Sequence, residues 1–169
     1  MSAGSCDSGR VTLARLSALA WEHTKVGVHE EPPGSNGGPQ IDAWNLAANG
    51  VLHEPWCMSF QHAAFAQAGV KLGGWAGVEN FLRWGELHGY EVTRPFRGDL
   101  VCFDWNGDRW YDHVGIVDKV LAVAPGGRPP YVIRTVEGNT GDAVRVKQRA
   151  GLTWKFLRVP GNVTPPLAL

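Results

Sequence analysis

The pattern of apolar residues changes at Pro95, and this change constrains the fold more than any other feature of the sequence. Before Pro95, apolar residues recur at helical spacing, and four segments are predicted helices: 11–26, 40–48, 57–68 and 78–88. After it, runs rich in β-forming residues alternate with glycine or proline turns, and five are predicted strands: 100–105, 114–123, 131–136, 144–148 and 154–159. Because tight turns between adjacent runs favour antiparallel pairing, the sequence predicts an α+β fold of helices followed by a meandering, mainly antiparallel sheet.

Length and composition are those of an ordinary globular domain. A chain of 169 residues normally forms one domain, which we expect at 11–159, between a polar segment at 1–10 and a linker-like tail at 160–169. Hydrophobic residues make up 44% and charged residues 19%, which argues against disorder. The 16 basic and 16 acidic residues cancel, which argues against nucleic acid as a partner. A monomer is expected.

The three cysteines cannot all pair, and their spacing is not that of a metal site, so we expect neither a disulfide scaffold nor a cysteine-bound metal. Cys57 opens the predicted helix 57–68, whose alanines allow close packing on several sides and mark it as the central helix. A thiol at a helix N-terminus meets free N–H groups and the positive end of the helix dipole, which favour the reactive thiolate. A buried structural cysteine is the alternative, and position alone supports both equally. Cys102 lies in a strand-like run and is expected in the core.

A histidine and a carboxylate stand at the ends of two neighbouring predicted strands. His113 begins one apolar run, and Glu137 ends the next. Asn139 lies two residues after Glu137, so in an extended chain both side chains would face the same side. A carboxylate or amide there can fix the tautomer and orientation of an imidazole that acts as the base for a nucleophile. Each residue alone is more often structural or exposed, but together with Cys57 they form a candidate triad.

Five stretches follow one another along the chain: VGVHEEPPGSNGGPQIDAW, PWCMSFQHAAF, GDLVCFDWNGD, DHVGIV and VEGNT. Together they resemble the CHAP domains, which are cysteine- and histidine-dependent amidohydrolases and peptidases of the NlpC-type papain-like group. Each stretch alone is weak, but all five in this order are specific, and the resemblance spans residues 12–158. It implies a papain-like fold in which a central helix carries the nucleophile and packs on the sheet.

The resemblance also implies roles for individual residues. Cys57 matches the nucleophile, His113 the general base, Glu137 the residue that orients it, and Asn139 a further polar position of the site. The implied substrate is the peptide part of peptidoglycan. The implied activity is hydrolysis of a cell-wall amide bond, by an endopeptidase or an N-acetylmuramoyl-L-alanine amidase that requires no cofactor. For the oxyanion we expect the Cys57 N–H as one donor and His53 or another side chain as a second.

Substrate-binding residues are expected in the loops that flank this site. Glu31 and Asn36 match the family's loop motif at the entry to the domain. Trp75 and Trp110 lie in glycine-rich or aromatic stretches, and loops commonly carry specificity on a rigid scaffold. The alternative is that both tryptophans pack onto the core, as most of the eight tryptophans of this chain are expected to do.

A possible metal site follows the first predicted strand. Its oxygen ligands resemble the first part of an EF-hand calcium loop and are Asp104, Asn106, Asp108 and Asp112. Gly115 stands where such a loop needs its closing glutamate. Because Asn106-Gly107 is a strong hairpin-turn dipeptide, a plain turn is favoured over a structural calcium.

Two other functions are compatible with these residues. One is an inactive wall-binding or structural module of a phage tail protein, and the other is an NlpC-type acyltransferase that passes the acyl group to an acceptor other than water. No stretch approaches the ~20 apolar residues of a membrane span, and no secretory signal pattern is present. We therefore expect a protein made in the host cytoplasm, such as a phage endolysin, that reaches the wall through holin-type or other export. A bacterial effector fits as well.

Overall fold

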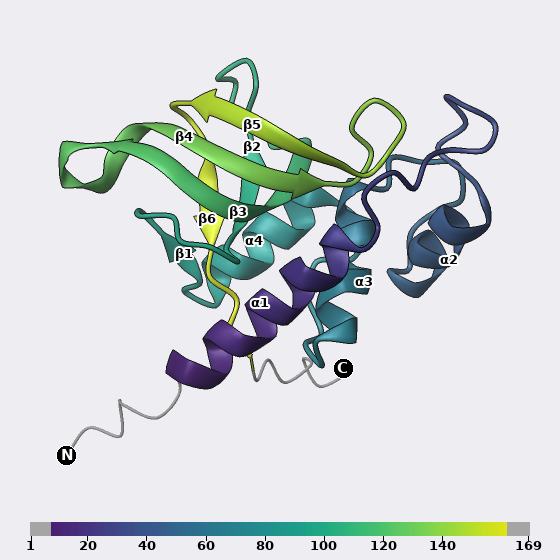
Figure 1. The fold of residues 1–169 in the computed structure, drawn as a ribbon, viewed down its shortest axis with the longest axis horizontal. Coiled ribbons are helices and arrows are strands. Elements are labelled where there is room, and N and C mark those ends of the chain that lie inside the picture. Colours follow the sequence, from purple (N-terminus) through teal and green to yellow (C-terminus); the bar gives the residue numbers. More distant parts are fainter. Residues whose placement is uncertain (1–7, 162–169) are drawn as a thin grey trace.

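A computed structural model describes residues 8–161, with helices in the first half and strands in the second (Figure 1). The four helices are α1 (Ser8–His23), α2 (Pro39–Ala47), α3 (Cys57–Gln67) and α4 (Val78–Leu87). They confirm the four predicted helices, with the first displaced by three residues toward the N-terminus. Most of the predicted N-terminal segment and tail, and Cys6, lie outside the described residues. Within residues 8–161, no helix has the length and apolar character needed to cross a membrane.

Six strands form one sheet: β1 (Glu91–Val92), β2 (Leu100–Phe103), β3 (His113–Ala124), β4 (Arg128–Glu137), β5 (Arg145–Gly151) and β6 (Lys155–Leu157). Their order in the sheet is β1-β6-β2-β3-β4-β5, and every pair of neighbours is antiparallel. The α+β class and the antiparallel pairing are thus confirmed. The expected meander is present from β2 to β5, but β6 departs from it, because it leaves β5 and pairs between β1 and β2. This position buries Phe156 on one face of the sheet and Leu157 on the other.

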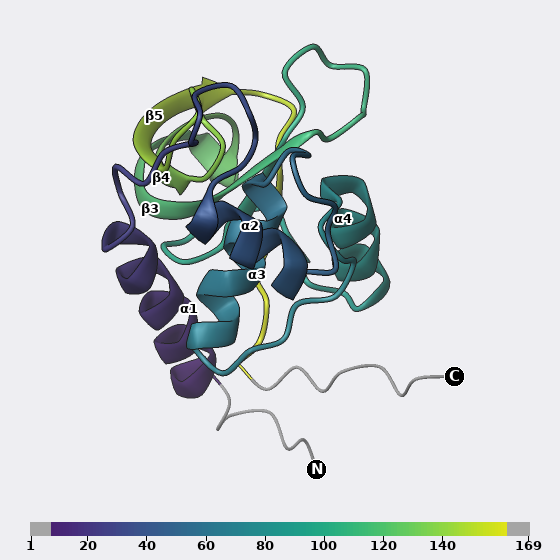
Figure 2. The ribbon, with the colours of Figure 1, turned by 90° about the vertical axis from the view of Figure 1, so that its right-hand side faces the viewer.

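The helices cover one face of the sheet. Helices α1, α3 and α4 pack against its strands, and α2 packs against α3, which is therefore the central helix that the sequence predicts. Side chains alternate along β2, so Leu100 and Cys102 face the helices while Val101 and Phe103 face the other way. The sheet curls so that β3, β4 and β5 partly enclose this second face (Figure 2). A smaller apolar cluster fills it.

An aromatic cluster joins α1, α2 and α3 just before the start of α3. Trp44 lies between Trp56 and Phe60, with ring centroids 5.8 and 5.0 Å apart, and Trp21 packs on the same group at 6.0 Å from Trp44. Trp56 and Phe60 have no exposed surface. This packing fixes the backbone at the first turn of α3.

Candidate active site

Cys57 is the first residue of α3 and is only 3% exposed. The N–H groups of a first helical turn have no partner within the helix, so its sulfur stands beside these donors and the positive end of the helix dipole. The preceding Trp56 is held by its indole N–H, which donates to Glu30 Oε1 at 3.0 Å. Packing and this hydrogen bond therefore fix the residue next to the thiol.

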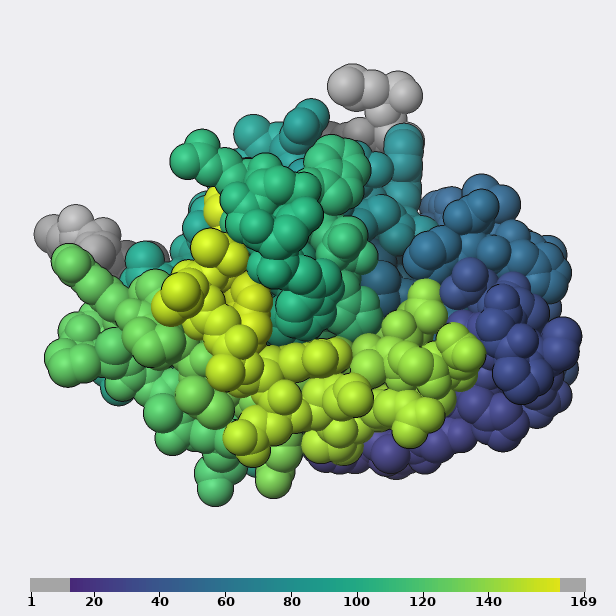
Figure 3. All heavy atoms as spheres, turned by 90° about the horizontal axis from the view of Figure 1, so that it is seen from above, coloured from purple at the N-terminus to yellow at the C-terminus, as the bar shows by residue number. Residues whose placement is uncertain are grey.

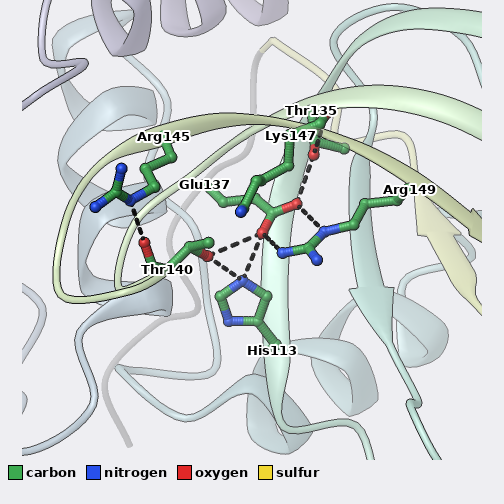
Figure 4. A network of polar contacts seen from close by, with 7 residues as sticks. All are labelled: His113, Thr135, Glu137, Thr140, Arg145, Lys147 and Arg149. Carbon is green, nitrogen blue, oxygen red and sulfur yellow. Dashed lines mark hydrogen bonds and ion pairs between the residues drawn. The ribbon is translucent and has the colours of Figure 1, made fainter.

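His113 begins β3 and Glu137 ends β4, and the pairing of these strands brings the two side chains together (Figure 4). His113 Nε2 lies 3.0 Å from Glu137 Oε2. Cys57 lies close enough to the ring to raise its pKa, and Nδ1 is the ring nitrogen that Glu137 leaves free for the thiol. Gly115 makes the approach of the carboxylate possible, because a Cβ at this position would lie 2.7 Å from Glu137 Cγ. Thiol, imidazole and carboxylate thus stand in the order that nucleophilic catalysis requires.

The charges in this row stabilise one another. Burial alone would lower the pKa of His113, but hydrogen bonds to Cys57 and Glu137 outweigh burial and raise it to about 9. Burial would likewise raise the pKa of Glu137, yet hydrogen bonds from Arg149 and His113 hold it well below its usual range. At neutral pH, His113 is therefore an imidazolium beside an ionised carboxylate.

Three residues that sequence reasoning missed surround the Glu137 carboxylate. Arg149 on β5 donates two hydrogen bonds to it, at 2.9 and 2.6 Å. The hydroxyl of Thr135 donates at 2.5 Å. The hydroxyl of Thr140 donates at 2.9 Å and lies 3.1 Å from His113 Nε2. Basic residues at every second position of β5 are the sequence signal that could have indicated a cationic face opposite the carboxylate.

The loop before α2 lies beside the turn after β4 (Figure 3). The backbone N–H of Glu30 donates to Asp142 O at 2.9 Å, and Glu30 Oε2 accepts from the Asn36 N–H at 2.8 Å. Asn36 therefore belongs to the network around the start of α3. Glu31, in contrast, has an exposed side chain whose carboxylate lies 3.8 Å from His29 Nε2. The buried carboxylate of this loop is that of Glu30, which is 1% exposed.

Asn139 lies in the turn after β4 with a φ of 54°, so the chain is not extended there. The prediction that its side chain faces the same side as Glu137 is therefore wrong. In the amide orientation that satisfies both ends of the side chain, its oxygen accepts from the backbone N–H of Trp56 at 3.1 Å and its nitrogen donates to Glu30 Oε1 at 3.3 Å. Asn139 thus holds the residue before the nucleophile. The place beside the ring of His113 belongs to Thr140.

A cleft of about 490 Å³ opens at Cys57. Trp75 and Trp110 both line this cleft and are 69% and 63% exposed, so neither packs into the core. A second cavity, of about 520 Å³, shares Trp75 but runs along α3 past His62 and does not include the nucleophile. Of the two, the cleft at Cys57 is the one that can present a substrate amide to the thiol.

The loop proposed for calcium is closed by its own hydrogen bonds. Asp104 accepts from the N–H groups of Gly107 and Arg109 at 2.7 and 3.1 Å, one to each carboxylate oxygen. Asn106 and Asp108 bond each other at 2.9 Å. Asp112 is exposed and lines the cleft instead. Within the described part of the chain, no three His, Cys, Asp or Glu side chains are grouped so that they could hold a metal ion.

Two further sequence-predicted residues lie apart from this chemistry. Cys102 has no exposed surface, as predicted for a core residue, and burial raises its pKa far above the ordinary value, so its thiol stays protonated. His53, a candidate oxyanion donor, points its Nδ1 to the backbone oxygen of Ser35 at 3.2 Å. Its ring therefore contacts the loop before α2.

Comparison with known families adds an independent finding. The family model of the CHAP domain matches residues 49–139, more than half of the chain. The matched segment contains Cys57, His113, Glu137 and Asn139, whereas Arg149 lies outside it. No curated protein and no solved structure matches the chain.

Proposed function

The chain belongs to the CHAP domain family, a family of peptidoglycan amidases and peptidases, and we propose that it hydrolyses a cell-wall amide bond with Cys57 as nucleophile. One observation carries this proposal: Cys57, at the start of α3, lines the cleft and lies beside the hydrogen-bonded pair of His113 and Glu137. A wall-binding or structural module has no use for an imidazole–carboxylate pair beside a thiol that lines a cleft.

The geometry supports a two-step reaction. The Cys57 thiolate attacks the amide carbonyl carbon, and the N–H groups at the start of α3, with that of Cys57 first among them, stand where they can donate to the oxyanion. The His113 imidazolium then gives its Nδ1 proton to the leaving amine, so the C–N bond breaks and a thioester remains. In the second step, His113 removes a proton from water, whose oxygen attacks the thioester. The acid and the thiolate are released, and the imidazolium is restored.

Glu137 has a positioning role in this scheme. Its contact with Nε2 fixes the tautomer in which Nδ1 faces the sulfur, and its negative charge stabilises the imidazolium. Thr140 supports the same contact through its hydroxyl. Because Thr140 remains, we expect Glu137→Gln to keep measurable activity, unlike His113→Ala.

The decisive experiment removes the nucleophile. We expect Cys57→Ala to fold normally and to lose all clearing of purified cell wall in a zymogram. Cys102→Ala is the matched control, because it removes a buried thiol of the same chain that is outside the cleft, and it should keep clearing. Full clearing by a folded Cys57→Ala variant would refute the mechanism. Wall binding without clearing by the unaltered protein would indicate a binding module, and neither binding nor clearing would indicate an acyltransferase.

We further propose that the bond lies within the peptide, which makes the protein an endopeptidase. The lining of the cleft includes Glu54, Glu79 and Asp112 and, among the described residues, no basic side chain. This charge matches a peptide segment with a free amine better than it matches a neutral sugar. Mass spectrometry of digested wall distinguishes the two bonds. Cleaved cross-links support the endopeptidase, whereas intact stem peptides released from the glycan would show an amidase.

A further inference from the structure

The Glu137 carboxylate has no exposed surface and is enclosed by donors on every side (Figure 4). Its Oε1 accepts from the Thr135 hydroxyl and from Arg149 Nε, and its Oε2 accepts from the Thr140 hydroxyl and from Arg149 Nη2. The contact with His113 also falls on Oε2. Arg149 therefore binds both oxygens, and its planar fork sets which of them faces the imidazole.

These groups form a row of alternating charge. In the active state the order is the Cys57 thiolate, the His113 imidazolium, the Glu137 carboxylate and the Arg149 guanidinium, whose charges cancel. Without Arg149, the two anions share a single cation in a buried place. An uncompensated buried charge costs free energy, and the pKa values of the neighbouring titratable groups shift in response. Arginine is suited to this position because its guanidinium stays protonated at every accessible pH.

Arg149 is itself held in place by aromatic rings. Its side chain is 23% exposed, and its guanidinium lies 4.9 Å from the ring centroid of Trp105 and 5.8 Å from that of Phe103. Phe103 also stacks on His113, with centroids 5.7 Å apart. One aromatic ring thus contacts both cations that bind the carboxylate, which keeps the whole row in one geometry.

Other charged groups surround the row at greater remove. On β5, Arg145 donates to the backbone oxygens of Thr140 and Gly141, and Lys147 lies between the two arginines in the strand. Asp112 directly precedes β3, and the loop before α2 contributes Glu30. Of the three cations on β5, Arg149 is the one that donates hydrogen bonds to the Glu137 carboxylate.

We propose that Arg149 is a positioning residue that orients Glu137 and weakens the attraction of the Glu137 carboxylate for the His113 proton. Arg149 thereby sets the upper pH limit of the active pair of Cys57 thiolate and His113 imidazolium. The catalytic meaning of this proposal rests on the proposed hydrolase function. Its sign follows from charge: removing Arg149 leaves the full carboxylate charge acting on the imidazolium and raises the pKa of His113 above its value of about 9. Removing the charge of Glu137 lowers the same pKa.

An NMR titration of the His113 ring in the full chain tests this inference without any need for activity. We expect Arg149→Met to raise the titration midpoint by roughly half to one pH unit and Glu137→Gln to lower it. The double variant should return toward the unaltered protein. The alkaline limb of kcat/KM on cell wall should move in the same directions, and kcat should fall in Arg149→Met because the carboxylate is no longer oriented.

Arg145→Met is the matched control, because it removes the same charge from the same strand but from a guanidinium that binds backbone oxygens. An unchanged or lower midpoint in Arg149→Met, or a shift equal to that of Arg145→Met, would overturn the proposal. If Arg149→Met does not fold, Arg149→Lys decides: a midpoint near that of the unaltered protein with reduced kcat supports it, and a raised midpoint refutes it. Absence of wall hydrolysis in the unaltered protein would reject the proposed function and leave the NMR result to judge the charge argument.

Discussion

Replacing Glu30 with glutamine tests how the loop before α2 holds the residue next to the nucleophile. The carboxylate of Glu30 is buried and accepts from Trp56 Nε1 at 3.0 Å and from the Asn36 N–H at 2.8 Å, with the Asn139 amide at 3.3 Å. Glutamine keeps one oxygen, so at least one of these donors loses its acceptor and faces an amide N–H₂ group. The substitution is close in shape, and the effect therefore reports the hydrogen bonds rather than a cavity.

The size of the effect follows from the burial. Leaving one buried donor without an acceptor costs about 1–3 kcal/mol of unfolding free energy. For a domain of this length, that loss lowers Tm by roughly 2–12 °C. Activity should fall as well, because a small displacement of Trp56 moves Cys57 relative to His113 and to the substrate carbonyl.

The assay is thermal and urea unfolding followed by circular dichroism at pH 7, together with wall clearing. Glu31→Gln is the matched control: it is the same substitution one residue away, on a side chain that is 65% exposed and 3.8 Å from His29. Its effect should stay within about 0.5 kcal/mol, as for most surface changes. Equal losses of stability in the two variants would contradict the role assigned to Glu30.

Three further predictions concern Gly115, the buried Glu22 and the loop that begins at Asp104. Gly115→Ala should lower kcat, because the added Cβ would lie 2.7 Å from Glu137 Cγ and displace the carboxylate from His113. An unchanged kcat would contradict this geometry. Glu22 is wholly buried, and burial raises its folded-state pKa well above the ordinary value although Gln61 lowers it. The contribution of Glu22 to stability should therefore be greatest below its unfolded pKa of about 4.3 and fall as pH rises toward the folded pKa. The Tm of Glu22→Gln relative to that of wild type should accordingly increase as pH rises above about 4. Finally, calcium added after chelation should change neither Tm nor activity, since the oxygens of Asp104 already accept backbone N–H groups, and a clear rise in Tm would restore the calcium site.

The sequence by itself determined the parts of this protein that depend on local periodicity. The four helices and the positions of the main strands follow from apolar spacing and from glycine and proline turns, because these act within a few residues. The placement of Cys57 at a helix start, and of His113 and Glu137 at strand ends, is local in the same sense. What the sequence could not supply is the distance between them, since no local pattern encodes how two strands are aligned.

The tertiary structure decided everything that depends on register between distant segments. Strand β6 lies between β1 and β2 because its apolar side chains are buried there, not because of any turn beside it. Arg149 reaches Glu137 because β5 pairs with β4 in one particular alignment, and a shift of one residue would direct its guanidinium to the other face. The choice between the adjacent Glu30 and Glu31 depends on tertiary partners: the Glu30 N–H bonds Asp142 O and its carboxylate accepts from Trp56 and Asn36, whereas the side chain of Glu31 stays in solvent.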